Sequence, residues 1–243
     1  MINLVTGGAG FLGSHLIDRL IACNQEVICL DNLITGSEAN ILQWKNHSNF
    51  SFIDQDVTKN LNIKVDKVWH LASPASPAKY KENPIYTIKT GVLGTLNMLK
   101  LARRNSAKFL FTSTSEIYGQ CVDFPQKESA ITFGNTHSTR ACYLESKRIS
   151  ETLCYEYGRL GVDVKIARIF NSYGPNMSKD DGRVVSNFIY QSISNKPITI
   201  YGNGDQTRSF CYIDDLISGL LLLMKSSYNK PINLGNDQEI SIL

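Results

Sequence analysis

The sequence predicts an α/β protein with a doubly wound parallel sheet and a smaller region at its C-terminal end. Over the first 170 residues, short apolar segments alternate with segments of helical periodicity, which is typical of βαβ units. A glycine-rich turn joins the first strand to the first helix. From residue 171 the chain becomes rich in turn-forming residues. We therefore expect a sheet domain over 1–170 and a smaller region over 171–243.

The sheet domain is expected to alternate strands with long helices. Its first strand covers residues 2–6, and its first helix follows over 13–23, where the apolar residues have helical spacing. A second helix over 84–105 begins at a proline, and a third over 141–160 is closed by Gly161. The remaining strands are expected at residues 26–30, 50–53, 67–71, 108–112 and 164–170.

The smaller region is expected to mix short helices with short strands. Helices are expected at 183–194 and 212–225, and strands at 197–201 and 231–234. Ligands bind at the carboxyl edge of sheets of this kind. We therefore expect the smaller region to pack against that edge and to supply contacts to a substrate.

The composition argues against several functional classes. The net charge is only +3, without a basic tail, so nucleic acid is not expected as a partner. The six cysteines form no CxxC pair and no cluster with zinc spacing, so we expect free thiols and no metal. The longest apolar run, Leu220–Met224, is too short to span a bilayer, and no signal peptide precedes the strand at Ile2. We expect a soluble, cytoplasmic protein without a membrane partner.

The glycine-rich turn has the spacing of a dinucleotide-binding loop. Gly8, Gly10 and Gly13 form the pattern GxGxxG between a strand and a helix, which is the context that this pattern requires. Glycine lets the backbone approach a pyrophosphate, and the helix N-terminus supplies N–H donors. Asp31 follows eighteen residues after Gly13, at the end of the second strand. Its carboxylate can bind a ribose 2′-hydroxyl and repel a 2′-phosphate, which favours NAD over NADP.

A tyrosine and a lysine one helical turn apart predict redox chemistry on a hydroxyl group. Tyr143 and Lys147 stand at positions i and i+4, so they share one face of the expected helix. A free phenol has a pKa of about 10 and is a poor base at neutral pH. A nearby ammonium and a positive nicotinamide ring favour the phenolate; lowering the pKa by about three units requires about 4 kcal/mol. Tyr143 is expected to take a proton from a sugar hydroxyl while the cofactor takes a hydride.

These motifs make the chain similar to the extended short-chain dehydrogenase/reductase family, which has a Rossmann fold and acts on nucleotide sugars. The resemblance runs from the glycine-rich loop to Asn233-Leu234-Gly235. Thr114-Ser115-Glu116 resembles the pattern of the UDP-glucuronate decarboxylases, or UDP-xylose synthases, whereas the 4,6-dehydratases carry Asp-Glu at the last two positions. Further stretches resemble the same subfamily: His70–Pro77, Thr87–Thr90, Arg140–Tyr143, Asp181–Phe188 and Gln206–Arg208.

The resemblance implies decarboxylation of UDP-glucuronate to UDP-xylose with bound NAD. Tyr143 would deprotonate the C4 hydroxyl while NAD takes the C4 hydride. The resulting 4-keto group lies β to the carboxylate, so it can absorb the electrons released with CO₂. Protonation of C5 and reduction of the ketone would then regenerate NAD.

The resemblance also implies roles for individual residues. The expected catalytic residues are Thr114 at the C4 oxygen, Ser115 and Glu116 near C5 and the carboxylate, and the pair Tyr143 and Lys147. The expected substrate-binding residues, with the arginines on phosphate or carboxylate oxygens, are Lys89, Asn171, Arg183 and Arg208. The expected cofactor-binding residues are Gly7, Gly10, Phe11, Leu12, Gly13, Asp31, Asn32, Thr35, Gly36, Asp56, Val57, Leu71, Ser73, Tyr143 and Lys147.

The resemblance further implies a homodimer formed through the helices 84–105 and 141–160. Four residues of these helices are expected either at that contact or against the sheet: Leu93, Leu96, Leu153 and Tyr157.

Two departures from the family pattern leave alternatives open. Gly91 stands where the family has asparagine, and glycine within a helix costs about 1 kcal/mol relative to alanine, so local order is expected to suffer. Family members continue for several tens of residues beyond the position of Leu243, so the substrate-binding region is expected to be incomplete. One alternative is another NAD-dependent nucleotide-sugar epimerase or dehydratase. The other is a truncated form that binds NAD with impaired catalysis.

Overall fold

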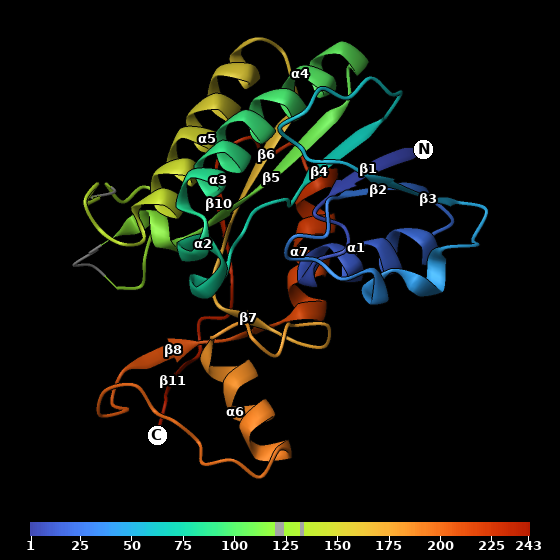
Figure 1. The fold of residues 1–243 in the computed structure, drawn as a ribbon. Helices are drawn as coiled ribbons and strands as arrows, with labels where there is room; N and C mark the ends of the chain where they lie inside the picture. The colour runs from blue at the N-terminus through green and yellow to red at the C-terminus, as the bar shows by residue number, and fades with distance from the viewer. Residues whose placement is uncertain (120–123, 132–133) are drawn as a thin grey trace.

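A seven-stranded sheet forms the centre of the computed structural model, which describes residues 1–119, 124–131 and 134–243 (Figure 1). The strand order is β10-β6-β5-β4-β1-β2-β3, and all pairings in this sheet are parallel. The chain starts at β1, winds outward to β3, and then crosses back to β4, which is the doubly wound order expected. The strands are β1 (Ile2–Thr6), β2 (Glu26–Asp31), β3 (Phe50–Asp54), β4 (Lys67–His70), β5 (Lys108–Thr114), β6 (Val164–Ile169) and β10 (Ile232–Leu234).

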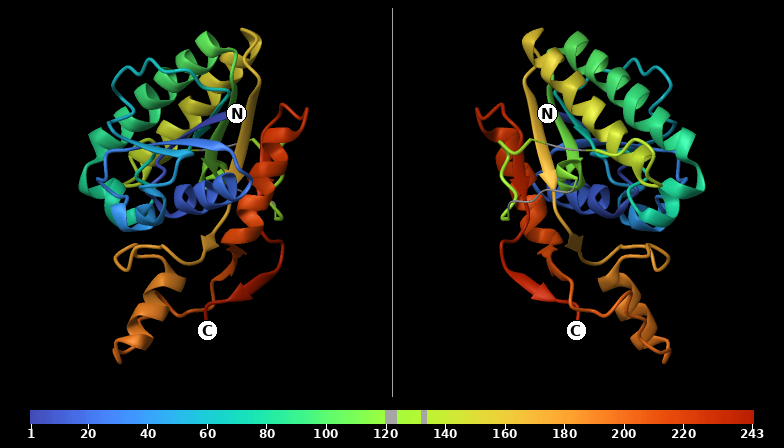
Figure 2. Two further views of the ribbon diagram at one scale, coloured as in Figure 1. Left: turned by 90° about the vertical axis from the view of Figure 1, so that its right-hand side faces the viewer. Right: turned by 90° about the vertical axis from the view of Figure 1, so that its left-hand side faces the viewer.

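Helices cover both faces of the sheet (Figure 2). One face packs against α1 (Phe11–Ala22) and α7 (Ile213–Lys225), and the other against α4 (Thr95–Asn105) and α5 (Ala141–Arg159). The shorter helices are α2 (Pro77–Glu82), α3 (Pro84–Lys89) and α6 (Val184–Ile193), and the single turns are η1 (Glu38–Asn40), η2 (Leu42–Trp44), η3 (Thr90–Gly94) and η4 (Ser115–Tyr118).

Two apolar cores lie between the sheet and its helices, because a strand points alternate side chains to opposite faces. In β5, Leu110 belongs to the core beside α1 and α7, whereas Phe109 and Phe111 belong to the core beside α4 and α5. All three side chains are buried. A sheet covered on both faces requires continuous apolar strands, which explains the apolar run in β5.

The helix expected over 84–105 is divided into α3, the π-helical turn η3 and α4. The preceding helix α2 was not expected, although its start carries a local signal. The Oγ of Ser76 accepts the N–H of Lys79 at 3.4 Å, and Pro77 stands in the first turn. The other elements expected before residue 171 are confirmed, with ends displaced by at most two residues.

The smaller region confirms three expected elements and contradicts one. Its helices α6 and α7 and its strand β10 lie where they were expected. The strand expected over 197–201 is wrong, since the N–H of Thr199 donates to the Gln191 side chain at 3.0 Å instead of to a neighbouring strand. Pro197 also has no N–H to donate. Two short strand pairs were missed: β7 (Ser172–Tyr173) with β9 (Cys211–Tyr212), and β8 (Thr207–Ser209) with β11 (Glu239–Ser241).

Part of the chain after residue 170 returns to the main sheet. β10 pairs with the edge of β6, and α7 contributes Leu216, Ile217 and Leu220 to the core beside α1. In contrast, α6, β8 and β11 extend away from the sheet as a separate lobe (Figure 2). Every residue of α6 is at least partly exposed.

Among the residues that the structure describes, no helix is long and apolar enough to cross a membrane. The expectation of free thiols is confirmed for the five cysteines in the described ranges. The sixth, Cys121, lies outside the described residues.

Candidate active site

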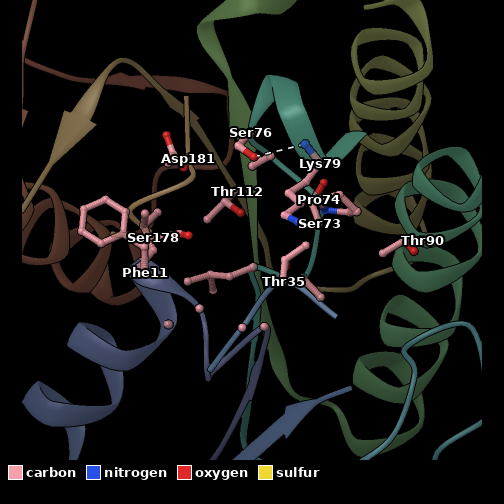
Figure 3. A pocket seen from close by; sticks show the side chains of 18 of the residues that line it. Phe11, Thr35, Ser73, Pro74, Ser76, Lys79, Thr90, Thr112, Ser178 and Asp181 are labelled. Carbon is pink, nitrogen blue, oxygen red and sulfur yellow. Dashed lines mark hydrogen bonds between the residues drawn. The ribbon is translucent and has the colours of Figure 1, made fainter. Parts of the chain in front are cut away.

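The carboxyl edge of the sheet opens into a pocket of about 630 Å³. Residues at the ends of β1, β2 and β5, residues of α5 and residues of the segment 171–183 line this pocket. Figure 3 shows Phe11 and Ser178 on one side of it and Ser73 and Pro74 on the other. Most residues predicted from the sequence line it: Gly7, Gly10, Phe11, Leu12, Gly13, Asp31, Asn32, Thr35, Gly36, Val57, Leu71, Ser73, Thr114, Ser115, Glu116, Tyr143, Lys147, Asn171 and Arg183.

The glycine-rich loop brings backbone close to backbone at the entrance of α1. Gly7 adopts a φ of +69°, and a Cβ there would lie 2.8 Å from the backbone N of Ala72. A Cβ at Gly13 would lie 2.2 Å from the carbonyl oxygen of Gly7. The helix starts after Gly10 without a side-chain cap from the described residues, which leaves N–H donors for an anion in the pocket.

Asp31 organises the neighbouring loops as well as lining the pocket. One carboxylate oxygen accepts the N–H of Ala9 at 3.0 Å, and the other accepts the N–H of Leu33 at 2.9 Å. Burial raises the pKa of Asp31, and these backbone N–H donors oppose that rise. The carboxylate therefore sits beside the glycine-rich loop, where a ribose bound after the pyrophosphate would reach it.

Asp56 does not line the pocket; instead, its carboxylate forms hydrogen bonds with neighbouring residues. Its Oδ2 accepts from Tyr86 Oη at 2.6 Å and from Asn32 Nδ2 at 3.1 Å, while its Oδ1 accepts the N–H of Thr58. Despite partial burial, these hydrogen bonds hold the pKa of Asp56 below its ordinary value. Val57, the next residue, lines the pocket.

Tyr143 and Lys147 lie buried on the same face of α5, as their spacing predicted. The Nζ of Lys147 lies 5.8 Å from the centre of the Tyr143 ring and donates to the carbonyl oxygen of Thr112 at 2.8 Å. The Tyr143 ring stacks on Tyr80 of α2, with ring centres 5.1 Å apart and planes at 6°. The strand β5 and the helix α2 together therefore fix this pair.

Burial and neighbouring charges of the chain shift the pKa values of both members of the pair. Burial raises the pKa of the Tyr143 phenol, and the carboxylate of Glu116 raises it further. A hydrogen bond from Thr114 and the charge of Arg183 oppose this rise without reversing it. Burial lowers the pKa of Lys147 to about 8. The residues of the chain thus favour the neutral phenol, and the positive nicotinamide ring included in the expectation would act in the opposite direction.

Glu116 presents one unpaired carboxylate oxygen at the end of β5. Its Oε1 accepts from Arg140, and its buried Oε2 has no hydrogen-bond partner among the described residues. Burial raises the pKa of Glu116, and Arg140 opposes that rise. The Oγ1 of Thr114 accepts the N–H of Glu116 at 3.2 Å and so closes the turn η4. This geometry suits a group that holds or moves a proton.

The residues predicted for the substrate are divided between two cavities. Arg183 forms a bidentate ion pair with the buried Asp181 at the start of α6. Asn171 and Arg183 line both the main pocket and a second cavity of about 240 Å³, which Arg208 also lines. Lys89 is exposed in the last turn of α3 and lines neither cavity.

Unpaired polar atoms in the pocket fit a polar cofactor such as NAD. Ser73 Oγ and Ser113 Oγ line the pocket and are buried without a hydrogen-bond partner in the described ranges. Buried polar atoms nearly always have partners, so a polar ligand explains these two. The glycine-rich loop suits the pyrophosphate, Asp31 suits a ribose, and Lys147 lies beside Tyr143.

Sequence reasoning missed three residues that shape the site. Tyr80 stacks on Tyr143 from a different helix, and no local pattern indicated that contact. Arg140 and Asp181 did carry a signal, because each stands two or three residues before a predicted site residue. His70 is a buried, packed histidine, with Thr6 Oγ1 at 2.8 Å and Thr95 Oγ1 at 3.1 Å from its ring nitrogens.

Comparisons with known proteins show which family this chain is similar to. A family model described as the NAD dependent epimerase/dehydratase family matches residues 3–235. UDP-glucuronic acid decarboxylase 1 of Arabidopsis thaliana is 53% identical over 241 residues, which are 99% of this chain and 55% of that protein. UDP-glucuronic acid decarboxylase 1 of Xenopus tropicalis is 52% identical over 241 residues, which are 99% of this chain and 57% of that protein. The chain therefore spans somewhat more than half the length of these relatives.

A solved structure extends the comparison to a bound nucleotide sugar. UDP-glucuronic acid 4-epimerase from Bacillus cereus, in complex with UDP-glucuronic acid and NAD, superposes with a TM-score of 0.86. The two sequences are 30% identical, and the match covers 100% of this chain and 80% of that one.

Proposed function

Because the chain belongs to the NAD dependent epimerase/dehydratase family, we propose that it binds NAD and converts UDP-glucuronate to UDP-xylose. One observation carries this proposal beyond the family: Ser115 and Glu116 line the same pocket as Tyr143 and Lys147. A carboxyl group at this position serves chemistry at C5, and Ser115 stands where the 4,6-dehydratases carry the aspartate they use for water elimination. The identity of about half of all aligned residues with two UDP-glucuronic acid decarboxylases supports the same reaction.

In the proposed mechanism, Tyr143 takes the proton of the C4 hydroxyl while Thr114 hydrogen-bonds the C4 oxygen. NAD, held by the glycine-rich loop and Asp31, would supply the hydride acceptor and donor for C4. Lys147 stands close enough to stabilise the phenolate electrostatically once the cofactor's positive ring offsets the effect of burial. The ring of Tyr80 holds the phenol in place by stacking on it.

Glu116 acts at the second stage of the proposed reaction. The ketone at C4 lies β to the carboxylate, so the electrons of the broken C–C bond are delocalised onto its oxygen as CO₂ leaves. The free Oε2 of Glu116 then controls proton delivery to C5, with Ser115 beside it. Arg140 orients Glu116 through the other oxygen. Tyr143 returns its proton to the C4 oxygen at the final reduction.

The second cavity gives the nucleotide part of the substrate a place beside the sugar. Asn171 and Arg183 line both cavities, so they suit the phosphates at the junction, and Arg208 suits the distal part of the second cavity. Contacts of Lys89 with the substrate and of Asp56 with the adenine remain predictions. So does the division into an NAD-binding part over 1–170 and a substrate-binding part over 171–243.

We also propose a homodimer through α3, η3, α4 and α5. Leu93 and Ile149 on this surface are 44% and 47% exposed, which supports an apolar contact. Leu153 and Tyr157 pack partly against the core and contribute less. A cytoplasmic location remains a prediction, supported by the free thiols of the described cysteines.

A second candidate is epimerisation at C4 of the same nucleotide sugar. The likeness to a solved UDP-glucuronic acid 4-epimerase favours it. The two reactions share Tyr143 and Lys147 but differ in the need for a carboxyl group beside C5. If the chain is an epimerase, Glu116 would be dispensable for the reaction.

Incubation of the purified chain with UDP-glucuronate and NAD, followed by mass spectrometry, tests the proposal. Release of CO₂ and formation of a UDP-pentose is the expected result. A product of unchanged mass but altered chromatographic mobility would indicate the epimerase. Unchanged substrate from a folded, NAD-loaded protein would overturn both.

A further inference from the structure

The π-helical turn η3 lies directly against the helix that carries Tyr143 and Lys147. It joins α3 to α4 over Thr90–Gly94, and its residues Thr90, Gly91 and Gly94 are buried. A π turn widens the helix by one residue, and such turns are frequent at functional sites. Here the widened turn brings the backbone of Gly91 to α5.

Gly91 and Ser146 occupy the same small space between η3 and α5. A Cβ at Gly91 would lie 2.7 Å from both the Cβ and the Oγ of Ser146, closer than non-bonded atoms approach. The glycine is needed here for space, because Gly91 has an ordinary helical backbone. Ser146 is 2% exposed, so its side chain has no route into solvent. The loss of order expected from glycine at this position is therefore offset by close packing.

Hydrogen bonds connect this contact to the catalytic turn of α5. The Oγ of Ser146 donates to the carbonyl oxygen of Tyr143 at 2.7 Å. The Oγ of Ser150, one turn later, lies 2.9 Å from the carbonyl oxygen of Gly91. Ser146 also directly precedes Lys147 in the chain. A shift of η3 against α5 would thus move both members of the pair.

We propose that Gly91 and Ser146 are a coupled pair of positioning residues that sets how closely α5 approaches η3. The pair acts on the reaction only through Tyr143 and Lys147, so its effect on turnover rests on the proposed function. The effect of the pair on the placement of α5 is independent of the proposed function. A larger residue at position 91 requires a smaller residue at position 146, and a change at one position is corrected by a change at the other.

Four proteins test this coupling: the unchanged chain, Gly91→Ala, Ser146→Gly and the double variant. Gly91→Ala is expected to lower kcat by about 10²-fold, since a displacement near 1 Å costs about that much. The KM for UDP-glucuronate is expected to stay within about twofold, because α5 does not carry the predicted nucleotide contacts. Ser146→Gly is expected to lower kcat by only a few fold. The double variant is expected to return to the level of Ser146→Gly.

Two readouts do not depend on turnover. Gly91→Ala is expected to lower the Tm and to speed amide hydrogen exchange over residues 141–150, and the double variant is expected to reverse both changes. The NAD content, measured after denaturing release, normalises kcat for cofactor loading in all four proteins, because Tyr143 and Lys147 are also expected cofactor contacts. If the unchanged chain has no turnover, the proposed function fails, while the Tm and exchange data still decide the coupling.

Gly158→Ala is the matched control on the same helix. A Cβ at Gly158 would meet no described atom within 4 Å, so this variant should leave kcat and the exchange of residues 141–150 unchanged. The coupling is overturned if Gly91→Ala behaves like Gly158→Ala. It is equally overturned if the double variant is no better than Gly91→Ala in Tm and exchange.

Discussion

Backbone groups form the end of the pocket where we propose that NAD binds, the nucleotide end, whereas paired side chains form the end where we propose that the sugar binds, the sugar end. At the nucleotide end, Gly7 and Gly13 leave no room for a Cβ, and backbone N–H groups hold both oxygens of Asp31. At the sugar end, Glu116 is paired with Arg140 and Asp181 with Arg183. The arginines retain 46% and 33% side-chain exposure.

The difference indicates which end is complete before a ligand arrives. The nucleotide end rests on the strands and helices of the core, which are the elements that open least readily in a folded protein. The ion pairs at the sugar end can exchange one partner for a phosphate or carboxylate oxygen of a substrate. We expect changes at the nucleotide end to alter stability and NAD content, and changes at the sugar end to alter turnover.

Tyr143→Phe is the most severe test of the sugar end. The variant keeps the stacking on Tyr80 but loses the oxygen that accepts the proton. We expect kcat to fall by about 10⁴-fold, with Tm and NAD content unchanged. Product formation followed by mass spectrometry checks this, with Tyr155→Phe on the exposed side of α5 as the control. Turnover above about one tenth of the original rate would exclude Tyr143 as the base.

His70 tests the nucleotide end through pH. Burial lowers the pKa of His70 to about 3, whereas the pKa of this histidine in the unfolded chain is about 6.5. Between these two pH values the unfolded chain binds a proton at His70 and the folded protein does not. Stability should therefore fall as the pH falls from about 6.5 towards 3, by up to about 5 kcal/mol from this group. His70→Gln should lose this part of the dependence. Urea unfolding between pH 4 and 7 measures it.

His47 provides the comparison for that pH series, because it is an exposed histidine near the start of β3. His47→Gln should keep the pH slope of the unchanged chain. Equal slopes for His70→Gln and His47→Gln would contradict the buried, neutral state of His70.

A third test compares stability in the sheet with stability in the separate lobe. Leu110→Ala empties a fully buried position of β5 and should lower the free energy of unfolding by about 3 kcal/mol. Ile193→Ala in α6, where the side chain is 75% exposed, should change it by less than about 0.5 kcal/mol. Denaturant midpoints distinguish the two. A large loss for Ile193→Ala would show that the lobe is covered in solution.

The smallest expected effect concerns the choice of cofactor. Asp31→Asn should weaken NAD binding by about tenfold and reduce the discrimination against NADP, because the negative charge beside the ribose is lost. Asp54→Asn is the control, since Asp54 stands beside Asp31 in the strand register but is exposed. Titration of the cofactor-free protein with each nucleotide gives the affinities. An unchanged preference in Asp31→Asn would place the ribose elsewhere.

Local sequence patterns predicted the strands and helices that depend mainly on interactions between residues close together in the chain. Alternating apolar runs gave the strands before residue 171, and the i, i+4 spacing placed Tyr143 and Lys147 on one buried face. The strand expected over 197–201 failed because an apolar run forms a strand only beside another strand. The N–H of Thr199 donates to the side chain of Gln191 instead.

Contacts between distant segments could not be read from the sequence. The stacking of Tyr80 on Tyr143 depends on how α2 is placed against α5, and the fit of Gly91 to Ser146 depends on the π turn. The burial that raises the pKa of Tyr143 could not be read either, since burial depends on packing rather than on spacing. Site residues on regular elements were thus easier to find than the residues that hold them.

The pairing of α1 with α7 also has a consequence during protein synthesis. α1 ends at Ala22, but β1 and β2 cover only part of its apolar residues until α7, which ends at Lys225, packs against the remaining apolar face. At ribosomal rates of about 5–20 residues per second, the growing chain exposes that face for roughly 10–40 s. The nascent chain therefore keeps this part of its first helix uncovered until α7 is made, and chaperones that bind emerging chains would meet it there.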